Sequence, residues 1–280
     1  MTIEKKLCGV NELLQDDNIS IEMQDMFKNN VSKKGLVIHM KNCNVSPIMY
    51  PDETFWMKPE EEIVVEIKGV CEKHSYHLDN FDFMQKKNIL EKVMPRVYSA
   101  DNLPEIEKKR YVYTRKFDML ILYYVPFDDP VDAGSVATIT ISNDILQGVG
   151  VTVEELHRVA LTNLDRNYKI MDMKDMFAID IPDDGFPKKI VTVQNFCQGA
   201  ATMFSRQVML ELEAEIGDYF AILPSSVHEI IVVPIKNYCD MQDFLKMVIE
   251  VNAGCVAPED KLTDSVYFWR YGKLNIYVPD

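Results

Sequence analysis

The sequence predicts an α+β fold with a largely antiparallel sheet. Strand-like runs rich in aromatic and β-branched residues are interleaved with amphipathic helical segments in a mixed order, without a regular βαβ series. Two pairs of strand-like runs near the C-terminal end are joined only by short turns, as antiparallel neighbours are. With 280 residues, 47% of them hydrophobic, the chain can bury one large core or two modest ones.

The first 30 residues predict one or two amphipathic helices, because their apolar residues recur at near-helical spacing. These residues are Leu7, Val10, Leu13 and Leu14, followed by Ile21, Met23, Met26 and Phe27. We therefore expect an N-terminal helical segment over residues 1–34 and an α+β domain over residues 35–280. The alternative is that this α+β domain consists of two subdomains with a boundary near residues 130–150.

The middle of the chain contains two ambiguous segments and four clearer ones. Residues 36–40 fit a strand or a helix end, and residues 63–67 fit a strand or a helix continued from Pro59. A helix is expected over residues 82–98. Strands are expected over residues 111–114, 119–125 and 135–141.

The second half has the best helix signal and the two turn-linked strand pairs. Thr152 and Glu155 form a capping box for a helix that runs to about residue 167. The other expected elements are strands at 190–193, 219–223 and 227–233, helices at 199–216 and 241–252, and a hairpin at 266–278 turning near Gly272. The strands at 219–223 and 227–233 are expected to pair through the Pro224-Ser225-Ser226 turn.

Composition excludes several classes of protein. The net charge of −14 argues against binding to nucleic-acid duplexes, which needs clustered Lys and Arg. No apolar run approaches the length of about 20 residues that spans a bilayer, so no membrane association is expected. The N-terminus lacks the apolar run of a secretory signal and the six cysteines are scattered, which predicts reduced thiols in the cytoplasm.

Several short motifs carry a family resemblance. They lie at residues 35–38, 46–50, 141–143, 193–200, 223–229, 250–252 and 262–267, and the Leu-Pro-Ser-Ser-Val-His-Glu segment at 223–229 is the most specific of them. Together they resemble the domain-of-unknown-function family five-six-eight-eight, over most of the chain from Leu36 to Tyr267. The resemblance implies a bacterial setting, in gut Firmicutes and their mobile elements. It implies no catalytic residues.

Seven polar residues within these motifs are candidate binding residues. They are Ser225, Ser226, His228, Glu229, Asn195, Asn143 and Asp264. The segment around His228 has the residue types of a hydrolase site, but on a strand His228 and Glu229 point to opposite faces. No Gly-x-Ser-x-Gly nucleophile elbow is present. We therefore predict no catalytic residue here and interpret the segment as a structural turn or a binding loop.

No cofactor or metal site is predicted. Cys71, His74 and His77 are competent zinc ligands, but no fourth ligand is evident. The acidic stretches 128–132 and 180–185 lack the register of a calcium loop. The glycines at 148 and 150 lack the Lys-Ser/Thr of a phosphate loop.

Two functions from different classes remain. The first is a non-enzymatic protein-interaction module with an unknown protein partner, which modulates host defence or element transfer. The Ser-Ser-Val-His-Glu turn and the methionine-rich segment 171–177 are its candidate contact surfaces. The alternative is a hydrolase or nuclease that assembles His228, Glu229, Asn195, Asn143 and Asp264 from distant segments.

Overall fold

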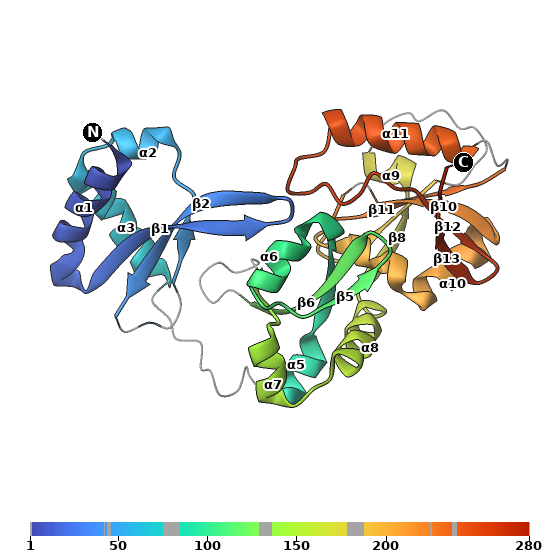
Figure 1. Cartoon of the computed structure of the whole chain (residues 1–280), viewed down its shortest axis with the longest axis horizontal. Helices are drawn as coiled ribbons and strands as arrows, with labels where there is room; N and C mark the ends of the chain where they lie inside the picture. The colour runs from blue at the N-terminus through green and yellow to red at the C-terminus, as the bar shows by residue number, and fades with distance from the viewer. Residues whose placement is uncertain are drawn as a thin grey trace. The chain divides into compact units, whose positions relative to one another are not determined.

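The computed structural model describes residues 2–41, 43, 46–74, 85–128, 136–177, 188–224, 226–236 and 240–279. The chain forms two compact units, shown in Figure 1. Unit 1 comprises residues 1–83 and 127–137, and unit 2 comprises residues 84–126 and 138–280.

Some residues singled out in the sequence lie outside the described residues. Among them are Ser225, His77 and the acidic stretch 180–185, together with most of the stretch 128–132.

Unit 1 is a three-stranded antiparallel sheet covered by helices, coloured blue to cyan in Figure 1. Its elements are α1 (Ile3–Leu14), η1 (Gln15–Asp17), β1 (Ile19–Lys28), β2 (Val31–Met40), β3 (Ile48–Met49), α2 (Glu53–Met57) and α3 (Glu60–His74). The ambiguous residues 36–40 thus belong to a strand, and residues 63–67 belong to a helix. Val10, Leu14, Ile38, Ile63 and Ile67 are buried together in its core.

The prediction of a second N-terminal helix was wrong, because residues 19–28 form strand β1. Ile21 is opposite Ile38 in an antiparallel ladder with β2, and this long-range pairing overrides the local helical spacing. The side chain of Asn11 on α1 bonds both the N–H and the carbonyl of Ile21, at 2.8 and 2.9 Å. These two bonds attach the helix to the open edge of the sheet.

Unit 2 contains two antiparallel sheets, and the smaller one consists of β4 (Met94–Ser99), β5 (Tyr113–Lys116), β6 (Met119–Asp128) and β7 (Val136–Thr140). Around it lie α5 (Lys86–Lys92), η2 (Ala100–Asn102), α6 (Leu103–Lys108), α7 (Asn143–Val149) and α8 (Val153–Leu164). The predicted cap of α8 is confirmed, since the Glu155 N–H donates to Thr152 Oγ1 at 3.1 Å.

The helix expected over residues 82–98 is much shorter than predicted. α5 ends at Lys92, and residues 94–99 form β4, which pairs with β6. Pro95 explains the difference, because proline has no N–H to donate within a helix and its ring clashes with the preceding turn.

The larger sheet has six strands in the order β13-β12-β10-β11-β9-β8. These are β8 (Tyr168–Asp172), β9 (Lys189–Val193), β10 (Tyr219–Leu223), β11 (Ile230–Pro234), β12 (Tyr267–Arg270) and β13 (Lys273–Ile276). Its helices are α9 (Met173–Phe177), η3 (Gly199–Phe204), α10 (Arg206–Ile216) and α11 (Asp240–Gly254). The predicted pairing of β10 with β11 and the hairpin near Gly272 are confirmed. The single helix predicted over 199–216 is instead two, because Ser205 caps the start of α10.

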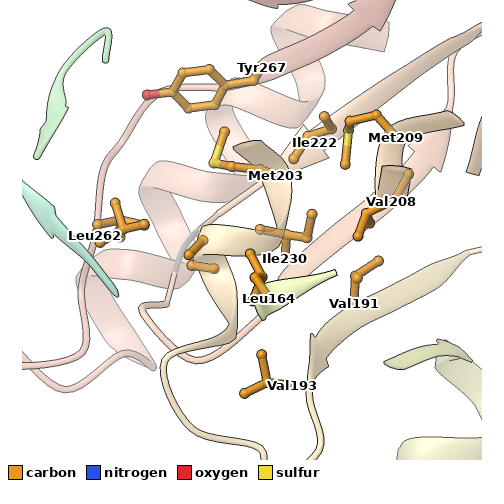
Figure 2. Close-up of a cluster of buried hydrophobic side chains, with 14 of the residues drawn as sticks. Leu164, Val191, Val193, Met203, Val208, Met209, Ile222, Ile230, Leu262 and Tyr267 are labelled. Atoms are coloured by element: carbon orange, nitrogen blue, oxygen red, sulfur yellow. The ribbon is translucent and has the colours of Figure 1, made fainter. Parts of the chain in front are cut away.

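Helices cover both faces of the larger sheet. Successive side chains of β10 point to opposite faces and pack against different helices. Phe220 and Ile222 pack into a core with residues of η3 and α10, whereas Ala221 and Leu223 pack into another core with residues of α11. Figure 2 shows part of the first core. Its labelled side chains are Leu164, Val191, Val193, Met203, Val208, Met209, Ile222, Ile230, Leu262 and Tyr267. The architecture is therefore α+β with antiparallel sheets, as predicted.

The carboxylate of Asp118, in the turn between β5 and β6, hydrogen-bonds the segment that leads into β12. Asp118 accepts hydrogen bonds from the hydroxyls of Thr263, at 2.6 Å, Ser265, at 2.8 Å, and Tyr267. Tyr267 is fully buried, and both its burial and its bond to Asp118 raise the pKa of its phenol.

Replacing Asp118 with alanine is expected to lower the free energy of unfolding by about 2–4 kcal/mol, because it leaves the buried Tyr267 hydroxyl without its acceptor. Urea denaturation of the purified protein measures this effect. Asp144→Ala is the control, since the Asp144–Arg110 pair is largely exposed and its loss is expected to cost less than about 1 kcal/mol. Equal losses in the two variants would contradict the role given to Asp118.

Within the described residues, no helix combines the length and the apolar character that a membrane crossing needs.

Candidate functional site

Three side chains of unit 2 that are far apart in sequence meet at one place. Cys197 lies in the loop between β9 and η3, His228 lies in the bend before β11, and Asp260 lies in the turn that follows α11. His228 and Asp260 are 32 residues apart, and their Nε2 and Oδ1 atoms are 3.1 Å apart. The Cys197 thiol and the His228 imidazole are close enough for each to shift the pKa of the other.

Backbone bonds hold the three segments in register. The Val227 N–H donates to the Asp260 carbonyl at 2.8 Å, and Ser226 forms a β-bridge with Lys261. On the other side, the N–H of Gly199 donates to the His228 carbonyl at 2.9 Å. The relative positions of the side chains are therefore fixed by the fold and do not depend on their own hydrogen bonds.

Gly199 is required at this junction. A Cβ atom on residue 199 would lie 2.4 Å from the His228 carbonyl oxygen and 2.6 Å from Thr192 Cα. The hydroxyl of Thr192 also donates to that same carbonyl, at 2.7 Å. Only glycine permits the Cys197 loop to approach the His228 segment this closely.

The backbone on either side of Cys197 has an uncommon conformation. Phe196 and Gln198 both have positive φ, 56° and 64°, in the left-handed region that non-glycine residues seldom adopt. The N–H of Cys197 donates to Asn195 Oδ1 at 3.2 Å, which closes the loop. Such conformations are concentrated at functional sites. They leave the Cys197 side chain exposed to solvent.

The hydrogen bonds define the protonation of His228. A carboxylate can only accept, so Nε2 carries the proton that is donated to Asp260. In the neutral form of the ring, Nδ1 accepts the N–H of Gln198 at 3.4 Å. Gln198 adjoins Cys197 in sequence, so Nδ1 lies toward the segment that carries the thiol.

The charges at the site favour a thiolate and an imidazolium. The hydrogen bond with His228 holds the pKa of the Cys197 thiol below its ordinary value, and the nearby Arg96 guanidinium lowers it further. The bonds to Cys197 and Asp260 raise the pKa of His228 to about 9, against the opposing effect of burial. A thiol that shares a proton with a neighbouring imidazole in this way is an activated nucleophile.

Arg96 is held in place by its own contacts. Its Nη2 atom donates to Thr140 Oγ1 at 2.9 Å, and its guanidinium carbon lies 4.6 Å from the centre of the Tyr124 ring. The position of this charge is therefore determined by packing within the smaller sheet of unit 2.

Four of the seven predicted site residues gather at Cys197. His228 belongs to the cluster, Asn195 shapes the cysteine loop, and Ser226 accepts the His228 N–H at 3.0 Å. Glu229 is half-buried next to His228, and its desolvation raises the pKa of its carboxyl group. The sequence argument against catalysis placed His228 and Glu229 on a strand, and this was wrong, since β11 begins at Ile230.

The other three residues are not brought to this place by any described contact. Asp264 accepts from Asn252 and Lys261, each at 2.8 Å, and Asn143 donates its backbone N–H to the Arg110 carbonyl at 2.8 Å. Ser225 lies outside the described residues. Sequence reasoning missed Cys197 and Asp260, although a free cysteine that has a His and an Asp elsewhere in the chain is a recognisable signal.

The cluster is arranged as a relay and not as a metal site. Nε2 of His228 faces the Asp260 carboxylate, and Nδ1 faces the N–H of Gln198. In the described part of the chain, no group of three or more His, Cys, Asp or Glu side chains is arranged to hold a metal. The cysteines in that part, Cys8, Cys43, Cys71, Cys197 and Cys255, are all free thiols.

The chain belongs to a family of unknown function, DUF5688, whose family model matches residues 3–271. This confirms the resemblance seen in the sequence motifs. Neither the curated proteins nor the solved structures gave a match. The family description carries no activity, and the functional argument therefore rests on the site.

The electrostatics of the site predict how Cys197 reacts with iodoacetamide as pH changes. The reaction needs the thiolate, so at neutral and mildly acidic pH its rate at Cys197 should exceed that of a free cysteine, whose pKa of about 8.5 leaves it mostly protonated there. It should fall only as pH drops through the lowered pKa of Cys197. Peptide mass spectrometry after timed labelling measures the rate at each cysteine separately.

His228→Asn is the matched variant, because asparagine cannot become a cation. Its Cys197 should react more slowly than the wild-type Cys197 below about pH 8, since the thiol loses the neighbouring cation that lowers its pKa. Parallel pH profiles for the two proteins would contradict the thiolate–imidazolium pair.

Proposed function

We propose that this protein is a cysteine-dependent acyl hydrolase or acyltransferase with Cys197 as its nucleophile. The observation that carries the proposal is the relay of Cys197, His228 and Asp260, in which the thiol is exposed and the base is oriented by a carboxylate. This develops the hydrolase alternative predicted for the Ser-Ser-Val-His-Glu segment, with a different nucleophile.

The geometry supports a two-step acyl transfer. The Cys197 thiolate attacks a carbonyl carbon of an amide, ester or thioester, and a C–S bond forms. His228 then donates the proton on Nδ1 to the leaving group as its bond to that carbon breaks. A water or another acceptor attacks the resulting thioester and gives a proton back to Nδ1, which regenerates the thiolate and the imidazolium.

Three other residues near Cys197 and His228 have roles in these reaction steps. Asp260 keeps the proton on Nε2 and thereby presents Nδ1 to the sulfur. When Nδ1 is protonated it no longer accepts the Gln198 N–H, and this donor beside the nucleophile becomes available to the developing oxyanion. Asn195 holds the Cys197 backbone in the conformation that exposes the thiol.

An activated ester tests the proposal directly. Incubation with p-nitrophenyl acetate should give a burst of p-nitrophenolate and an acetyl group on the peptide that contains Cys197, removable by hydroxylamine as a thioester is. Cys255→Ala, which removes another exposed thiol, should leave the burst unchanged. A burst that survives Cys197→Ala, or the absence of any adduct on Cys197, would refute the proposed nucleophile.

The second candidate function involves a protein partner, which either binds this protein or is the substrate of its acyl transfer. Met247, Ile249 and Val251 on α11 are large apolar side chains exposed at 44%, 47% and 38%. Affinity purification with Cys197→Ala and with Ser226→Ala as baits distinguishes the two roles. A substrate should be enriched by the first variant, whereas a partner that binds at the turn should be lost with the second. The cytoplasmic setting expected from the sequence belongs to this proposal, since a reducing compartment keeps Cys197 as a thiol.

A further inference from the structure

One cavity in unit 2 shares no described residue with the Cys197, His228 and Asp260 cluster. Its volume is about 400 Å³, within the range of small-molecule sites. The residues that matter most among its lining are Lys116, Arg206, Lys273, His157, Phe204 and Trp269. They come from β5, α10, β13, α8, η3 and β12, and we call this cavity the basic groove.

Among the residues that the structure describes, the charged groups that line the basic groove are all of one sign. Lys116, Arg206 and Lys273 are exposed, and none of them has an ion pair or hydrogen-bonded side-chain partner among the described residues. The protein as a whole carries 44 acidic and 30 basic residues, so three unpaired cations around one cavity are unexpected. A cavity lined by one sign of charge attracts ligands of the other sign.

The N-terminus of helix α10 adds to the positive potential of the basic groove. Arg206 is the first residue of this 11-residue helix, and Ser205, its cap, also lines the groove. The N–H groups of the first helical turn carry partial positive charge, which favours an anion at this end. The negatively charged carboxylate of Asp165 accepts a hydrogen bond from the Ser205 hydroxyl, and Asp165 is not among the described residues that line the groove.

The rest of the lining suits a flat apolar group. Trp269 is 4% exposed, so only an edge of its ring borders the groove, and its indole N–H is already bonded to Glu213 at 2.6 Å. Phe204 is half-buried and Phe117 is 39% exposed. Aromatic faces of this kind stack on ligand rings.

His157 adds a neutral polar group to the groove. Its Nδ1 atom is 2.9 Å from the hydroxyl of Tyr123, which is in turn bonded to Thr114. Its other nitrogen has no partner among the described residues. Burial lowers the pKa of His157, and the ring is therefore uncharged at neutral pH.

We infer that the basic groove binds a small phosphorylated molecule with an aromatic ring, of which nucleotides are the obvious class. The phosphate is held by Lys116, Arg206, Lys273 and the start of α10. The ring lies against Phe204 and Phe117, close to the buried Trp269. The function of such binding is separate from the acyl-transfer proposal, and either can fail without the other.

Trp269 makes the inference testable by fluorescence. The chain has two tryptophans, and Trp56→Phe in unit 1 leaves Trp269 as the sole reporter. In this variant, we expect AMP or ADP to change the emission of Trp269. The change should saturate as the nucleotide concentration rises. The affinity for adenosine, and for inorganic phosphate measured by calorimetry, should be at least about tenfold weaker, because each makes only half of the contacts.

A charge-matched pair of variants locates the site. Lys116→Gln/Arg206→Gln/Lys273→Gln removes the three cations of the groove. Lys87→Gln/Lys92→Gln/Lys174→Gln removes three cations that do not line it. The first should weaken nucleotide binding at least about tenfold and the second should leave it within about twofold. Equal effects in the two variants, equal affinity for phosphate and AMP, or no saturable signal would each overturn the inference.

Discussion

Cys197→Ala is expected to lower the rate of acyl transfer by about 10³-fold or more, because no other group at the site can form the thioester. His228→Ala should cost a similar factor, since it removes both the cation that stabilises the thiolate and the proton donor for the leaving group. The double variant should be no slower than either single variant, because residues that act as a unit have non-additive effects. Release of p-nitrophenolate under single-turnover conditions measures all three.

Asp260→Asn should have a smaller effect, about 10-fold to 100-fold, because the amide oxygen can still accept from Nε2 while the negative charge is lost. Asp264→Asn is its matched control four residues away, since Asp264 bonds Asn252 and Lys261 and not His228. Equal rates for these two variants would contradict a role for Asp260, and a wild-type rate for Cys197→Ala would contradict the site as a whole.

The sequence was sufficient where local chemistry decides the structure. The capping box at Thr152 and the hairpin at Gly272 depend on residues within a few positions of one another, and both were predicted. Residues 19–28 were misassigned because Met23, Met26 and Phe27 fit a helical spacing, whereas Ile19, Ile21 and Met23 alternate as in a strand. Pairing with β2, which no local pattern reveals, decides between these two conformations.

The candidate site was only half predictable for the same reason. Ser226, His228 and Glu229 stand together in a distinctive motif, so the sequence drew attention to them. Cys197 and Asp260 are brought to His228 by the Gly199 and Val227 backbone bonds, which belong to tertiary structure. Treating His228 as part of a strand also hid its freedom to face another segment.

Gly199→Ala is expected to destabilise unit 2 by about 2–4 kcal/mol, through overpacking against groups that cannot move aside. The added methyl would lie 2.4 Å from the His228 carbonyl oxygen, and that carbonyl is already held by the Gly199 N–H and the Thr192 hydroxyl. Relief requires the Cys197 loop to separate from the His228 segment. The variant should therefore also lose the rapid alkylation of Cys197 near neutral pH.

Gly148→Ala in α7 is the matched control. A Cβ atom there meets nothing within 4 Å, and alanine favours a helix over glycine by up to about 1 kcal/mol. In urea denaturation, Gly199→Ala should unfold at a lower urea concentration than the wild type, whereas Gly148→Ala should unfold at the same or a higher concentration. Timed alkylation of Cys197 should be slower in Gly199→Ala and unchanged in Gly148→Ala. If Gly199→Ala were as stable and as reactive as the wild type, the loop would not depend on this contact, and the fold would not be what positions the nucleophile against its base.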